Sequence, residues 1–86
     1  MALFKKVEEK DIGSTPILLA VMETDDGIIV GRIVTHGIDQ MFSTVSYDPP
    51  IADAISIASR LAMQNKVAVN VYDPQNRWQT NWGILH

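Results

Sequence analysis

Few residues in this sequence have the types and spacing that favour catalysis. His36 and Asp39 lie three positions apart, so a histidine and a carboxylate can meet as they do in many general-base sites. No cysteine is present, and no serine accompanies the pair in a recognisable nucleophile pattern. A loop histidine in solvent explains the pair better. We therefore assign no catalytic residue, and the sequence favours a chain that is not an enzyme.

Metal and cofactor sites are equally poorly supported. The absence of cysteine excludes a disulfide framework and thiolate metal sites, and the two histidines, His36 and His86, stand far apart. A phosphate site needs a glycine-rich loop before a helix, but the expected helix follows Asp48 and two prolines, which offer a negative charge and missing N–H groups. The adjacent Asp25 and Asp26 resemble half of an acid pair, but a tight turn favours aspartate for local hydrogen bonding alone. We expect no metal and no cofactor.

The two tryptophans are the most informative residues. Trp78 and Trp82 lie within five residues near the C-terminus, beside Arg77. Large aromatic side chains are enriched in the energetically dominant parts of interfaces. The alternative is that both tryptophans close a thin core beside Tyr72. The sequence thus makes Trp78, Trp82, Tyr72 and Arg77 candidate interface residues and leaves their burial open.

Charge argues against a nucleic-acid partner. The net charge is -3, and after residue 53 the cations are only Arg60, Lys66 and Arg77, which is too few for dense phosphate neutralisation. Residues 23–53 carry six acids against one arginine. This asymmetry could favour head-to-tail contact between subunits, although an ordinary solvated surface explains it more simply.

Local patterns predict the elements. Residues 17–24 and 28–35 are apolar or β-branched and flank an Asp-Asp-Gly turn, which is typical of a hairpin, and residues 41–47 alternate as a third strand. Apolar residues three and four apart predict an amphipathic helix over 49–64, with Asp48 as N-cap and alanines at 52, 54, 58 and 62 forming a narrow packing surface. Residues 67–72 alternate strictly, a type I turn begins at Asp73, and residues 77–85 are expected to return as a last strand.

These elements predict one α+β domain over 1–86, with residues 1–15 as an arm or a short helix. We expect two layers, a five-stranded antiparallel sheet in the order β-β-β-α-β-β packed on one helix. One helix leaves the other sheet face open, and a chain of 86 residues builds only a thin core, so self-association as a dimer is expected.

The functional hypothesis is a non-enzymatic protein-interaction or regulatory module that partners itself or another protein. The alternative is a small-ligand-binding domain or small enzyme with a pocket on the open sheet face or between subunits, using Arg32, His36 and Asp39. Nucleic-acid binding is the third hypothesis. The N-terminus has no signal-peptide pattern and no apolar run could span a membrane, so the expected location is the cytoplasm.

Overall fold

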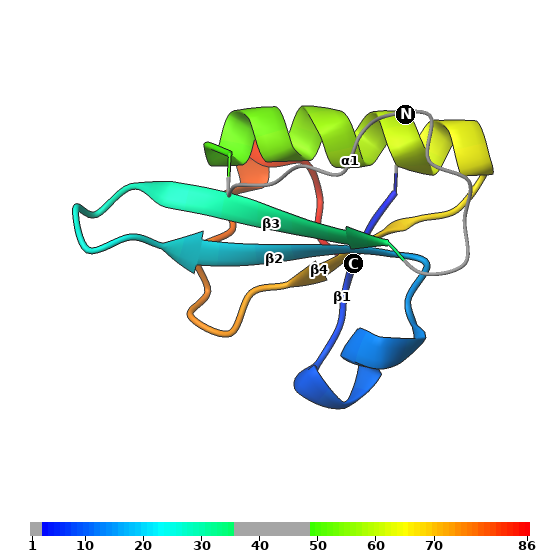
Figure 1. Ribbon diagram of the computed structural model, residues 1–86, viewed down its shortest axis with the longest axis horizontal. Coiled ribbons are helices and arrows are strands. Elements are labelled where there is room, and N and C mark those ends of the chain that lie inside the picture. Colours follow the sequence, from blue (N-terminus) through cyan, green and yellow to red (C-terminus); the bar gives the residue numbers. More distant parts are fainter. Residues whose placement is uncertain (1–2, 36–48) are drawn as a thin grey trace.

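The computed structural model describes residues 3–35 and 49–86. Its centre is a mixed four-stranded sheet with one long helix on one face (Figure 1). The strands are β1 (Phe4–Lys6), β2 (Ile17–Glu23), β3 (Ile29–Thr35) and β4 (Val69–Tyr72), in the order β1-β4-β2-β3. The α+β class is confirmed. The expected antiparallel arrangement of the whole sheet is wrong, because β4 runs parallel to both β1 and β2.

The path of the helix explains the parallel strand. Pro50 pairs with Val30, close to the carboxyl end of β2, and α1 (Ile51–Asn65) starts there. Fifteen helical residues span about 22 Å, enough to return the chain to the amino end of β2. Because α1 brings the chain back to that end, β4 runs in the same direction as β2 and antiparallel to β3, the strand that precedes the helix.

The predicted hairpin is confirmed. β2 and β3 pair antiparallel from Ile17 opposite Thr35 to Glu23 opposite Ile29. The connecting turn places Gly27 at φ 81, a backbone conformation that glycine adopts without a steric penalty. The predicted third strand at 41–47 lies outside the described residues. The prediction of Asp48 as N-cap is wrong, because the helix begins at Ile51 and Pro50 occupies the N-cap position.

The predicted helix is also confirmed, with Pro50 at the N-cap position and Lys66 ending it in the left-handed conformation. Its packing surface is narrower than expected. The buried helical residues are Ala54, Ala58, Leu61 and Ala62, whereas Ala52 is exposed. Gly31 of β3 lies so close to Ala54 that an added Cβ would stand 2.6 Å from the alanine Cβ. Small residues on both elements therefore set the helix-to-sheet distance.

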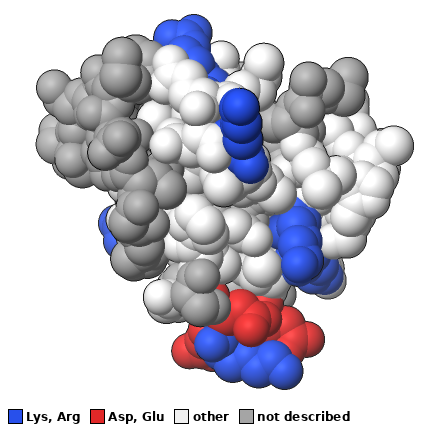
Figure 2. Space-filling view, turned by 90° about the vertical axis from the view of Figure 1, so that its right-hand side faces the viewer, with Lys and Arg blue, Asp and Glu red and all other residues white. Residues whose placement is uncertain are grey.

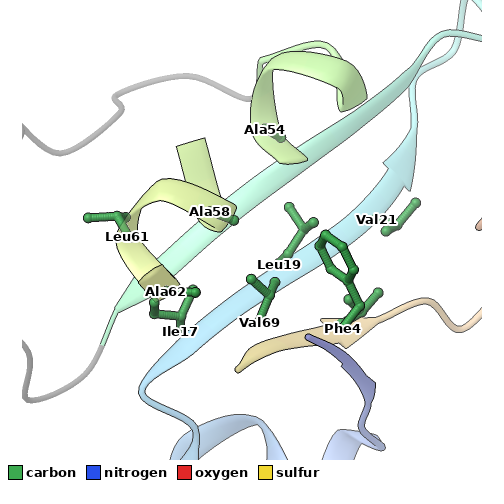
Figure 3. Packing of buried hydrophobic residues seen from close by; sticks show 10 residues of the cluster. Phe4, Ile17, Leu19, Val21, Ala54, Ala58, Leu61, Ala62 and Val69 are labelled. Carbon is green, nitrogen blue, oxygen red and sulfur yellow. The ribbon is translucent and has the colours of Figure 1, made fainter. Parts of the chain in front are cut away.

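The core lies between α1 and one face of the sheet (Figure 3). Alternate residues of β2 and β4 supply its centre: Ile17, Leu19, Val21, Val69 and Val71. The other face is only partly open, because Leu18, which alternation places there, is 3% exposed.

Both ends of the chain differ from expectation. Residues 1–15, expected to be an arm or short helix, contain strand β1 and the 3-10 helix η1 (Glu9–Ser14). The predicted last strand over 77–85 is wrong: the segment contains the 3-10 helix η2 (Thr80–Trp82) and a single parallel bridge between Leu85 and Phe4. Residues 84–86 therefore lie beside β1, at the outer edge of the sheet.

Candidate functional site

A buried carboxylate positions the tryptophan segment. Asp73 directly follows β4 and is 4% exposed. Its two carboxylate oxygens accept the backbone N–H groups of Arg77 at 2.8 Å and Trp78 at 2.7 Å. Its carbonyl also accepts the N–H of Asn76 at 3.3 Å, as the predicted turn requires. Because two charged hydrogen bonds hold the chain here, residues 77 and 78 fold back toward the sheet instead of extending into a strand.

The aromatic cluster consists of Phe4, Trp78 and Trp82. The ring centroids of Trp78 and Phe4 are 5.2 Å apart, and those of Trp78 and Trp82 are 5.4 Å apart in an edge-to-face arrangement. The Trp78 indole donates to the Gly83 carbonyl at 2.9 Å. A Cβ at Gly83 would stand 2.8 Å from the Phe4 ring, and its φ is 134, so only glycine fits this crossing.

The two tryptophans have different surroundings. Trp78 packs against the hydrophobic core and is half-buried, whereas Trp82 is half-buried against Trp78 without belonging to that core. From the sequence, the two tryptophans are expected to share one role, either in the core or at an interface. Trp82 is the last residue of η2 (Thr80–Trp82), whereas Trp78 precedes this 3-10 helix, so the two side chains meet different parts of the molecule.

The outer edge of the sheet is defined here as Leu3 and residues 84–86, which adjoin the aromatic cluster in sequence at Phe4 and Gly83. The His86 N–H donates to the Phe4 carbonyl, and the Lys6 N–H donates to the His86 carbonyl, both at 2.9 Å. Since neighbouring residues of an extended chain direct their N–H and C=O groups to opposite sides, those of Leu85 point away from β1. Leu3 and Ile84, each one residue before the Phe4–Leu85 bridge, are 51% and 71% exposed.

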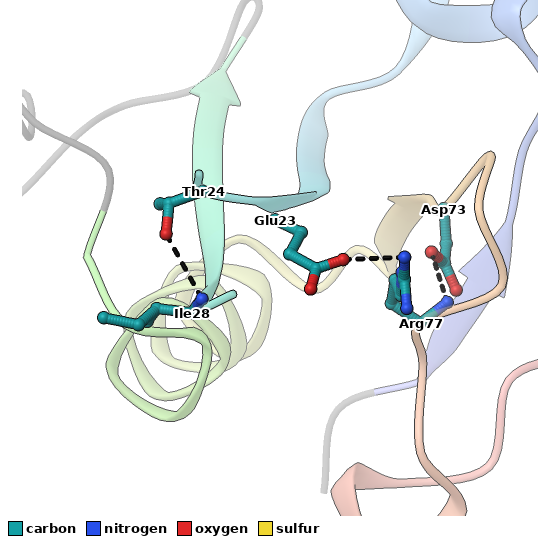
Figure 4. Close-up of polar contacts among 5 residues, drawn as sticks. All are labelled: Glu23, Thr24, Ile28, Asp73 and Arg77. Carbon is teal, nitrogen blue, oxygen red and sulfur yellow. Dashed lines mark hydrogen bonds and ion pairs between the residues drawn. The ribbon is translucent and has the colours of Figure 1, made fainter. Parts of the chain in front are cut away.

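Arg77 and Tyr72 lie in different surroundings from the tryptophans. The Arg77 guanidinium pairs with the Glu23 carboxylate at 2.6 Å, which ties the hairpin to the turn after β4 (Figure 4). Tyr72 is half-buried and lines a hollow at the end of β4 together with Lys6. The described ring contacts join Trp78 to Phe4 and to Trp82, whereas the described contacts of Arg77 and Tyr72 are with Glu23 and with the hollow.

Of the residues of the ligand-binding alternative, the structure describes only Arg32. Arg32 is an exposed residue of β3, opposite Ala20 in the register. His36 and Asp39 lie outside the described residues. Across 3–35 and 49–86, no group of three histidine, aspartate or glutamate side chains could hold a metal ion. The described part of the chain also contains no helix with the length and hydropathy of a membrane span.

Sequence reasoning missed two features of this region. The Asp73 carboxylate clamp had a local signal, an aspartate four and five positions before the amides that it binds. The pairing of Phe4 with Leu85 had none, because the two residues are separated by almost the whole chain. Comparisons with protein families, with curated proteins and with solved structures found no match for this chain.

Proposed function

We propose that this chain acts by protein contact rather than by catalysis, and that it associates with a second copy of itself. The observation that supports this proposal is the exposed backbone and apolar side chains at the outer edge of the sheet. The Leu85 backbone faces away from β1 there, and no described residue bonds to it. Two of the large apolar side chains that the described residues expose, Leu3 and Ile84, stand at the same edge. A strand edge with exposed apolar side chains is a surface onto which another strand can add.

A two-fold arrangement suits this edge. If two copies pair their 84–86 segments antiparallel, each Ile84 meets the same surface of its partner, as an isologous contact requires. Three residues provide few hydrogen bonds, so most of the association energy has to come from apolar area. Trp82, half-buried beside the edge, adds an aromatic side chain of the type that dominates such interfaces.

Light-scattering molar mass, measured from low to hundreds of micromolar protein, tests this proposal. We expect a dimer for the parent chain and a monomer for Ile84→Lys. Because Ile84 is exposed, the two proteins should melt alike at concentrations where the parent is monomeric, and the parent should melt higher where it is dimeric. Met63→Lys is the matched control, since Met63 is 60% exposed and belongs to α1, not to the outer edge. A parent chain that stays monomeric, or an Ile84→Lys variant that dimerises as the parent does, contradicts the proposal.

A further inference from the structure

His86 shares one side of the outer edge with Ile84. Leu85, which lies between them, packs against the hydrophobic core. Because side chains alternate along an extended chain, Ile84 and His86 both point to the side of the sheet that is opposite α1. His86 is exposed, as Ile84 is. The edge therefore presents an apolar side chain and a titratable side chain two positions apart.

Backbone hydrogen bonds hold His86 at this place. Its N–H donates to the Phe4 carbonyl and its carbonyl accepts the Lys6 N–H, both at 2.9 Å. The neighbouring Leu85 directs its own N–H and C=O away from β1, toward any strand that adds to the edge. A strand that bonds to Leu85 must therefore pass beside both Ile84 and His86.

The charged groups around His86 come from β1 and η1. Lys5 lies next to His86 in the register of the parallel bridge, and Lys6 follows in the same strand. Glu8 and Glu9 come next, where η1 begins. On the face drawn in Figure 2, acidic side chains gather only at the lower end, where η1 lies in Figure 1. The chain of 86 residues also carries a carboxylate after His86. Of all these groups, only the imidazole changes its charge substantially between about pH 5.5 and 8.

We infer that protonation of His86 weakens the association of two copies, so that the dimer forms near pH 8 and dissociates as the solution is acidified. This inference rests on the proposed self-association. When two copies pair antiparallel around Leu85, each Ile84 lies directly opposite the partner's His86. Side chains that are directly opposite in such a pair have Cβ atoms about 4.5–5.5 Å apart. A neutral imidazole packs against the isoleucine, whereas an imidazolium loses water there without meeting an opposite charge.

The direction of the pH effect follows from the form of histidine that each state accepts. The separate chain keeps His86 in water in both forms, whereas the dimer favours the neutral form, so dissociation takes up protons as the pH falls. The two-fold symmetry places two such contacts in each dimer. We expect the Kd of the dimer to rise about fivefold for each contact, and about 25-fold in total, between about pH 8 and 5.5.

Light-scattering molar mass of the full chain, measured as a function of concentration at both pH values, tests this inference. His86→Gln has a neutral side chain at both values, so this variant should dimerise with the same Kd at both. His36→Gln is the matched control, because it replaces the other histidine of the chain and should keep the pH dependence of the parent. His86→Lys carries a positive charge at both values and should associate weakly even at pH 8.

The outcomes separate this inference from the proposed self-association. A parent dimer with the same Kd at both pH values, or a pH dependence that persists in His86→Gln, overturns the inference and leaves the proposed dimer intact. Acid unfolding would act on His86→Gln as on the parent, so it counts as such persistence. Loss of the pH dependence in His36→Gln also overturns the inference. A parent chain that is monomeric at pH 8 and hundreds of micromolar overturns both proposals.

Discussion

Replacing Gly31 by alanine tests the close approach of α1 to the sheet. Gly31 lies in β3 and faces Ala54, and its backbone has no positive φ that would itself require glycine. A Cβ at this position would stand 2.6 Å from Ala54 Cβ, 2.8 Å from Leu19 Cδ1 and 3.4 Å from Ile51 Cδ1. Carbon atoms pack at about 3.5–4.0 Å, so α1 would have to withdraw by about 1 Å while Leu19 adjusts.

Two opposing effects determine the magnitude. Overpacking a core of this kind costs about 1–3 kcal/mol. Replacing glycine by alanine also restricts the unfolded chain, which favours folding by about 0.4–1 kcal/mol. We expect the free energy of unfolding of Gly31→Ala to fall by about 1–2 kcal/mol. For a domain of this size, that loss lowers Tm by roughly 5–15 °C.

Thermal melting and urea denaturation measure this loss. Gly13→Ala is the matched control, because no heavy atom lies within 4 Å of the Cβ that it adds, and we expect it to be neutral or slightly stabilising. Ala54→Gly removes the closest contact, so Gly31→Ala should cost less in that background than in the parent. A Gly31→Ala variant as stable as the parent, or one with the same cost in both backgrounds, refutes this account of the packing.

Three further predictions concern the segment after β4. Asp73→Ala should lower the free energy of unfolding by about 2–4 kcal/mol in urea, because two backbone N–H groups lose a charged acceptor; a loss below about 0.5 kcal/mol contradicts the clamp. Trp78→Ala should lower the free energy of unfolding by about 3 kcal/mol and lower Tm far more than Trp82→Ala does. Melting curves and molar mass, measured on both variants, separate a core role from an interface role; equal melting of the two variants would show that the distinction is mistaken. Glu23→Gln should cost less than about 1 kcal/mol, with the difference shrinking as salt is added, because its ion pair with Arg77 is half-exposed; a large cost that salt leaves unchanged argues against this assignment.

Local patterns were sufficient to predict the hairpin, the helix and the turn at Asp73. In each, the residues that determine the conformation lie within a few positions of one another. Gly27 supplies the backbone angle of the hairpin turn, and apolar residues three and four apart place one side of α1 against the sheet. Strict alternation likewise placed Val69 and Val71 on the core side of β4. None of these four predictions, for the hairpin, the helix, the turn and the alternation in β4, needs contacts from elsewhere in the chain.

The order and direction of the strands depended on contacts between distant residues. β4 inserts between β1 and β2 because α1 returns the chain to the amino end of β2, and no local pattern specifies the strand beside which it lands. The three residues of β1 are too few to show a period.

The candidate site shows the same division. Residue type alone identified the tryptophans and Tyr72, but only the tertiary structure decided that Trp78 packs on Phe4 and that Tyr72 lines a separate hollow. Residues 77–85 contain alternation typical of a strand, and the Asp73 clamp overrides it. A buried carboxylate bound to two amides outweighs a weak local preference, because its charged hydrogen bonds are stronger where the surrounding chain excludes water.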